Sequence, residues 1–236
     1  MLIFSATILN AQTVQKPQPE NMQAAVTRYG IYSMKSDIDS RLVAANNTSV
    51  DFVRQSTLLS TWNGISDGGI DYWCSRKKKI ILNINNDSTP SYFPTNLSAY
   101  KNKLQSFLNV YADSIKLAVI ENEELNNDTL LSLSHFGSVQ SYINELSVAV
   151  YLCKQKKIPV TNGGIASQIA ASLKHYYDIN GLADSSAWLV SQMGGIPADS
   201  MVWKRCDSLL SAYKNLGLTY VNLHWYEPKK GMDRIT

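Results

Sequence analysis

The chain has 236 residues, of which 44% are hydrophobic and 17% are charged. This length and composition suit a globular protein with one large domain or two small ones. The formal net charge of +3 is too small, and the basic residues are too scattered, for a nucleic-acid-binding surface.

The first twelve residues resemble a secretory signal. An apolar run at 2–9 precedes the small residue Ala11 near a plausible cleavage point, although no basic residue precedes that run. Residues 13–23, with two prolines among polar side chains, are predicted to form a linker. No other segment approaches the roughly 20 apolar residues of a membrane span. We therefore expect a secreted or periplasmic protein whose domain covers residues 24–236. The alternative to a signal is that residues 1–12 form a flexible apolar N-terminus.

The three cysteines, Cys74, Cys153 and Cys206, lie far apart and lack the spacing of a zinc site. All three fall in segments that we expect to be helical, where cysteine usually packs as a small apolar side chain. One pair could form a disulfide in an oxidising compartment, and the spacing does not indicate which. We predict no metal site, and the lack of nucleotide-binding motifs predicts no cofactor.

Segments typical of strands alternate with amphipathic segments along the chain. The predicted strands are short aliphatic or β-branched runs at 28–32, 50–59, 80–85, 115–121, 158–162 and 218–224. The predicted helices lie at 37–45, 68–78, 97–112, 136–156, 166–177 and 199–216, with a looser stretch at 178–197. This alternation is typical of βα units, so we predict an α/β fold with a parallel sheet.

The predicted fourth strand ends in an acidic cluster. Its aliphatic residues are followed by Glu121, Asn122, Glu123 and Glu124. Carboxylates this close repel one another, which costs free energy unless they are used or screened by water. Polar residues also follow other predicted strands, at 62–63, 85–87, 162–164 and 224–227. The carboxyl ends of parallel strands are where α/β proteins bind ligands, so these residues predict a site, with a charged surface loop as the alternative.

Three of these strands resemble those of the (β/α)8-barrel glycoside hydrolases, in the clan that includes many cellulases and mannanases. In that clan the second strand carries Val-Arg, the fourth ends in Asn-Glu and the sixth carries His-x-Tyr. The matches here are, in the same order, Val53-Arg54, Asn122-Glu123 and His224-Trp225-Tyr226. The resemblance covers residues 29–228 and implies a TIM barrel that hydrolyses a poly- or oligosaccharide with retention.

The resemblance implies that Glu123 is the general acid/base and that a second carboxylate is the nucleophile. Crowding by Glu121 and Glu124 is expected to raise the pKa of Glu123. The side chains expected to bind the carbohydrate are Asn122, Arg54, His224, Tyr226, Trp62, Trp225 and Asn162. Structural roles are the alternatives: an ion pair for Arg54, a core position for His224 and packing for the tryptophans.

The resemblance is incomplete towards the C-terminus. We predict about six strands, whereas a closed barrel of this type has eight. The clan's nucleophile is a glutamate at the end of the seventh strand, and no residue up to Thr236 can be assigned to it. Glu227 lies before Pro228 in a loop and is not assigned that role. We therefore expect a fragment of a longer protein, truncated before the last two βα units.

Two other functions also fit parts of the sequence. The segment 64–68 matches Gly-x-Ser-x-Gly between a strand and a helix, as in the nucleophile elbow of α/β-hydrolases. Ser66 would then be the nucleophile, with His224 as base and Asp178 or Asp199 as the acid, although an ordinary polar loop explains the same residues. A non-catalytic carbohydrate-binding barrel is the second alternative, since fold does not fix function.

Overall fold

The computed structural model describes residues 30–31, 52–87, 93–122, 139–165, 169–192, 201–218 and 220–222. The predicted signal-like segment, the linker and the helix expected at 37–45 lie outside these residues. So do Glu123, Glu124, His135, Asp199 and the segment that carries His224, Trp225 and Tyr226.

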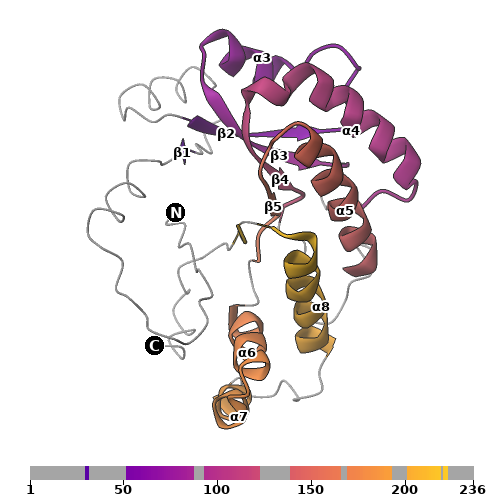
Figure 1. Cartoon of the computed structure of the whole chain (residues 1–236). Coiled ribbons are helices and arrows are strands. Elements are labelled where there is room, and N and C mark those ends of the chain that lie inside the picture. Colours follow the sequence, from indigo (N-terminus) through magenta and orange to yellow (C-terminus); the bar gives the residue numbers. More distant parts are fainter. Residues whose placement is uncertain are drawn as a thin grey trace.

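Five parallel strands form a single sheet (Figure 1). The strands are β1 (Gly30–Ile31), β2 (Phe52–Leu58), β3 (Lys79–Asn85), β4 (Ile115–Ile120) and β5 (Val160–Asn162). Their order in the sheet is β1-β2-β3-β4-β5, so each described strand lies beside its neighbours in sequence. The predicted α/β class with a parallel sheet is confirmed.

Helices connect the strands and continue after the last of them. The helices are α3 (Gly68–Ser75), α4 (Leu97–Tyr111), α5 (Val139–Gln155), α6 (Ile169–Ile179), α7 (Ala183–Gln192) and α8 (Met201–Leu216). A short 3-10 turn, η1 (Ala112–Ser114), joins α4 to β4. In Figure 1, α4 and α5 lie side by side against the sheet, and α8 lies next to α5. None of the described helices has the length and apolarity needed to cross a membrane.

Capping groups set the ends of several helices. The Asp67 carboxylate accepts hydrogen bonds from the amides of Gly69 and Ile70 at the start of α3, and Asn96 accepts one from Ala99 at the start of α4. At the far ends of α3 and α5, Lys77 and Lys157 adopt a left-handed φ of 58°. This conformation closes each helix and turns the chain towards the next strand.

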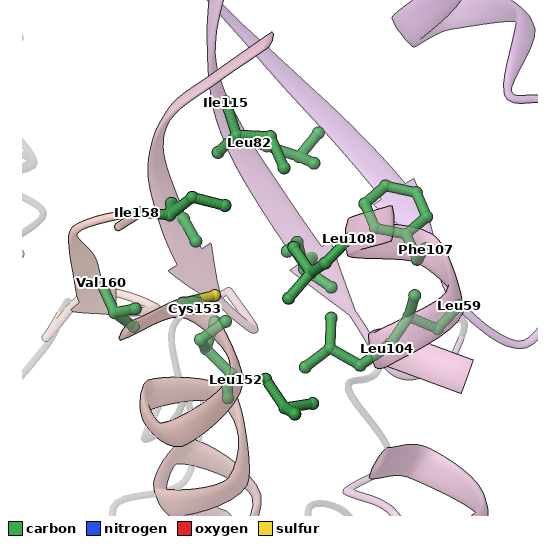
Figure 2. Close-up of a cluster of buried hydrophobic side chains, with 14 of the residues drawn as sticks. Leu59, Leu82, Leu104, Phe107, Leu108, Ile115, Leu152, Cys153, Ile158 and Val160 are labelled. Atoms are coloured by element: carbon green, nitrogen blue, oxygen red, sulfur yellow. The ribbon is translucent and has the colours of Figure 1, made fainter. Parts of the chain in front are cut away.

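The hydrophobic core lies between the sheet and the connecting helices. Ile80, Leu82 and Ile84 alternate along β3 and are fully buried. Figure 2 shows Leu82 and residues of α4 in the same cluster, together with Leu152 and Cys153 from α5. Because side chains alternate across a strand, the residues between these aliphatic positions face the other side of the sheet.

The cysteines follow the sequence prediction. Cys74 lies in α3, Cys153 in α5 and Cys206 in α8, and all three are free thiols in the structure. Cys153 and Cys206 are buried, as expected for small apolar side chains.

Two predicted segments differ from the structure. The stretch at 178–197 was expected to be loose, but it contains helix α7, which follows the left-handed Gly181 and buries only Ser186 and Leu189. So few buried positions leave little helical periodicity to detect. The strand expected at 218–224 is not formed by its described residues, Leu218 and 220–222. Side-chain hydrogen bonds to β5 replace a strand ladder there.

Candidate functional site

A chain of hydrogen bonds crosses three strands, from the first half of β2 through β3 to the carboxyl end of β4. Arg54 on β2 donates from Nε to Oδ1 of Asn83 on β3 at 2.8 Å. Asn83 in turn donates from Nδ2 to the carbonyl oxygen of Glu121, directly after β4, at 3.0 Å. Asn83 is 1% exposed and lies on the face of the sheet opposite Leu82 and Ile84. The structure therefore connects the predicted site residue Arg54 to the end of β4.

Glu121 makes a sharp turn at the end of β4. Its φ is 61°, a left-handed conformation that costs a residue with a side chain roughly 1–2 kcal/mol. The end of β3 holds it in place: the Glu121 amide donates to the Ile84 carbonyl at 2.9 Å, and the Asn86 amide donates to Glu121 Oε1 at 2.6 Å. The next residue, Asn122, is exposed at the edge of the sheet.

The Glu121 side chain meets a second buried carboxyl group. Glu145 on α5 is, like Glu121, 0% exposed. Burial, and then the neighbouring Glu121 carboxyl, raise the pKa of Glu145 well above its usual range. Both effects favour the protonated form of the Glu145 carboxyl group. The expected effect of Glu121 on Glu123 stays a prediction.

A tyrosine on α5 connects the ends of β4 and β5. The Tyr142 hydroxyl donates to the carbonyl oxygen of Ile120 at 3.1 Å and accepts from the amide of Gly163 at 3.1 Å. Sequence reasoning missed Tyr142 and Glu145 as part of the site because both lie on a helix, away from the strand ends. The sequence could have indicated a role for Asn83, because it is an amide side chain within a run of isoleucine and leucine.

Asn162 ties the segment after α8 to the end of β5. Its Nδ2 donates to the carbonyl oxygen of Asn222 at 3.1 Å, and the Asn222 amide donates to Asn162 Oδ1 at 2.6 Å. Thr161 adds a hydrogen bond from its hydroxyl to the Tyr220 carbonyl oxygen at 3.0 Å. Asn162 therefore anchors the chain two residues before His224. Its predicted contact with a carbohydrate stays a prediction.

Trp62 occupies a packing position rather than an open platform. Its ring is 8% exposed and meets Phe107 of α4 edge-to-face, with ring centroids 5.3 Å apart. This contact favours the core-packing alternative, and the expected contact of Trp62 with a sugar ring stays a prediction. The sequence did not predict this packing because the aromatic partner, Phe107, lies on a helix 45 positions further along the chain.

Ser66 lies in a polar loop that leads into α3. The Asn63 side chain accepts hydrogen bonds from the amides of Ile65 and Ser66 at 2.8 and 3.0 Å. A nucleophile elbow holds its serine on a sharp, strained turn. Here the positive φ of 89° belongs to Gly64, and Ser66 is not among the described residues with positive φ. This geometry favours the ordinary loop over the serine nucleophile.

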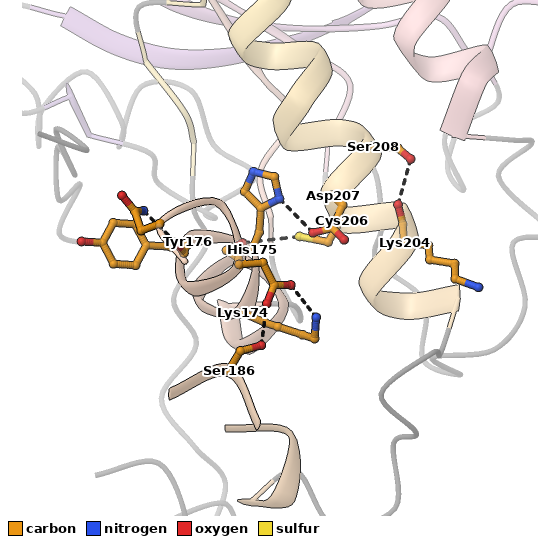
Figure 3. A network of polar contacts seen from close by, with 11 residues as sticks. Lys174, His175, Tyr176, Ser186, Lys204, Cys206, Asp207 and Ser208 are labelled. Atoms are coloured by element: carbon orange, nitrogen blue, oxygen red, sulfur yellow. Dashed lines mark hydrogen bonds and ion pairs between the residues drawn. The ribbon is translucent and has the colours of Figure 1, made fainter. Parts of the chain in front are cut away.

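A separate polar network joins α6, α7 and α8 (Figure 3). Asp178, a candidate acid for a serine hydrolase, pairs with Lys174 at 2.6 Å and accepts from the Ser186 hydroxyl at 2.6 Å. Burial acts to raise the pKa of Asp178, but these hydrogen bonds outweigh it and lower that pKa. His175 lies 2.8 Å from Asp207 between Nδ1 and Oδ1, which joins α6 to α8. The network connects the three helices, so the role of His175 in this structure is structural.

The described residues place Asn122 at the carboxyl edge of the sheet, whereas Arg54 lies in the first half of β2 and connects to that edge through Asn83 and Glu121. Glu123, His224, Trp225 and Tyr226 lie outside the described residues, so their roles stay predictions. Within the described ranges, no three histidine, cysteine or acidic side chains come together as a metal site would require. No protein-family model, curated protein or solved structure matches this chain. Its function is therefore inferred from residues and geometry alone.

Proposed function

We propose that this protein is a glycoside hydrolase-like protein whose site lies at the carboxyl ends of its parallel strands. The observation that carries the proposal is the strand order β1-β2-β3-β4-β5, in which each described strand lies beside the preceding one. Doubly wound sheets reverse their strand order at a switch point, whereas the wall of a (β/α)8 barrel adds strands in sequence. This order supports the barrel that the sequence resemblance implies.

The hydrogen bonds at the end of β4 support the assignment of the acid. Asn122 follows a residue that β3 holds through its amide, its carbonyl and its carboxylate. A catalytic side chain must be attached to a rigidly held backbone, because proton transfer depends closely on geometry. Glu123 is the next residue, and we assign it the role of general acid/base. Arg54, Asn122, His224, Trp225 and Tyr226 are the proposed carbohydrate contacts.

The proposed reaction has two steps. In the first, the protonated Glu123 donates its proton to the glycosidic oxygen as the bond from that oxygen to the anomeric carbon breaks, while a nucleophilic carboxylate about 5–5.5 Å away attacks that carbon. In the second, Glu123 removes a proton from water, which attacks the same carbon and releases the carboxylate. The sugar leaves with its original anomeric configuration.

The test is hydrolysis of aryl glycosides and oligosaccharides by the complete natural protein. Glu123→Gln is expected to lower kcat/KM by about 10²–10⁴-fold, as for loss of a general acid/base. Asp113→Asn is the control, since it neutralises an exposed acid in η1, outside this cluster, and is expected to leave the activity unchanged. Carbohydrate binding without hydrolysis would contradict the catalytic role and favour the non-catalytic barrel.

A further inference from the structure

The Tyr142 hydroxyl makes hydrogen bonds to the backbone where the pairing of β4 with β5 ends. Ile120 and Asn162 are the last residues paired between β4 and β5. Directly beyond them, the hydroxyl donates to the Ile120 carbonyl oxygen and accepts from the Gly163 amide, both at 3.1 Å. A single side chain from α5 therefore satisfies one backbone group at the end of each strand.

Past this bridge the two chain segments leave the sheet in different conformations. Glu121 has a φ of 61° and Gly164 a φ of 127°, both outside the range of a strand. Strands that kept pairing would carry both segments onward together. Because the hydroxyl satisfies the two buried backbone groups, the strands can part without leaving either group unpaired. β4 is thereby able to turn at Glu121, two residues before Glu123.

The Tyr142 side chain is held in place by its position on helix α5 and by its packing. Tyr142 is 1% exposed, and its ring packs against Phe93 with ring centroids 5.3 Å apart. One turn later on the same helix, Glu145 interacts with the Glu121 side chain. Helix α5 thus holds the Ile120 carbonyl oxygen through Tyr142. Ile120 lies two residues before the predicted site residue Asn122 and three before Glu123.

We propose that Tyr142 is a positioning residue for the acid/base Glu123, acting through the Ile120 carbonyl and the Gly163 amide. This inference rests on the proposed function of Glu123. Loss of the hydroxyl would deprive both buried backbone groups of this partner and loosen the two strand ends. A displacement of about 1 Å at a group that transfers a proton can slow the reaction by about a hundredfold. Contacts that only hold the sugar would be affected less.

The test compares Tyr142→Phe with Tyr111→Phe in the complete natural protein. Tyr111 is the matched control because its hydroxyl also joins two elements, accepting from the Asp67 amide at 2.6 Å and donating to Asp71 at 2.9 Å. It lies at the end of α4, before β4 begins, and is 4% exposed. Each variant is measured for kcat, for KM and for amide hydrogen exchange at 118–122 and at Gly163.

Tyr142→Phe is expected to lower kcat by about 10–100-fold with little change in KM, and to speed exchange at Gly163 by about tenfold. Tyr111→Phe is expected to do neither. Wild-type exchange and wild-type kcat in Tyr142→Phe would overturn the inference, as would an equal loss of kcat in Tyr111→Phe. A wild type that hydrolyses no glycoside contradicts the proposed function instead, and the exchange rates then decide alone whether Tyr142 holds the strand ends.

Discussion

The carboxyl groups of Glu121 and Glu145 interact within the core, and both residues are 0% exposed. Burial and the nearby Glu121 raise the pKa of Glu145, so the folded protein keeps a proton that the unfolded chain releases above its ordinary value near 4.5. A raised pKa stabilises the fold fully below that ordinary value. The contribution is lost as pH rises towards the raised pKa.

Replacing Glu145 with glutamine should remove this pH dependence. An amide has no proton to lose, so Glu145→Gln should match the wild type near pH 4.5 and become relatively more stable above it. The gain is at most about 1.4 kcal/mol per pH unit, the free energy of one pKa unit. Urea unfolding at pH 5 and pH 8 measures it. An equal loss of stability at both pH values would show that Glu145 is ionised in the fold.

Asn162 is expected to contribute stability by anchoring the segment 220–222. Asn162→Ala removes the partner of the Asn222 amide, and leaving such a buried group unpaired costs about 1–3 kcal/mol. The Asn222 carbonyl oxygen loses one of its two donors and keeps the Ile165 amide. The matched control is Asn109→Ala, which removes an exposed amide on α4 and should change stability by less than about 0.5 kcal/mol. Denaturant unfolding measures both. Similar values for the two variants would contradict the anchoring role.

Ser66 is expected to take no part in catalysis. Its loop is organised by Asn63 and leads into the cap of α3, as in ordinary connections. Ser66→Ala should therefore keep wild-type hydrolysis of glycosides, and a fluorophosphonate probe should not label Ser66 in the wild type. Labelling of Ser66, lost in Ser66→Ala, would favour the serine hydrolase and contradict the glycosidase proposal.

The sequence predicted the sheet well because its signals are local. The runs at 80–85 and 115–121 are short, aliphatic and bounded by polar residues, which is typical of buried parallel strands. They correspond to β3 and β4 within one residue at each end. The predicted helix at 97–112 likewise corresponds to α4 within one residue.

Features that depend on tertiary contacts were not predictable in this way. The apolar spacing within 136–156 predicts a buried face made of Val139, Ile143, Leu146, Val150 and Cys153. Leu146 and Cys153 are buried, whereas the other three are only partly buried, and the buried face also includes Tyr142 and Glu145. A glutamate in a sequence indicates solvent exposure, and no local feature of the sequence indicates that Glu145 is buried. Trp62 shows the same limit, because its packing role depends on Phe107.

The most direct test of the central proposal is the leaving-group dependence of Glu123→Gln in the complete natural protein. A general acid matters most when the leaving group is a poor one, such as a sugar or a phenol of high pKa. We expect Glu123→Gln to lose about 10²–10⁴-fold in kcat/KM on such substrates and far less on dinitrophenyl glycosides, whose leaving groups need no proton. Equal activity of Glu123→Gln and wild type across the series would contradict the assignment of Glu123 as the acid/base.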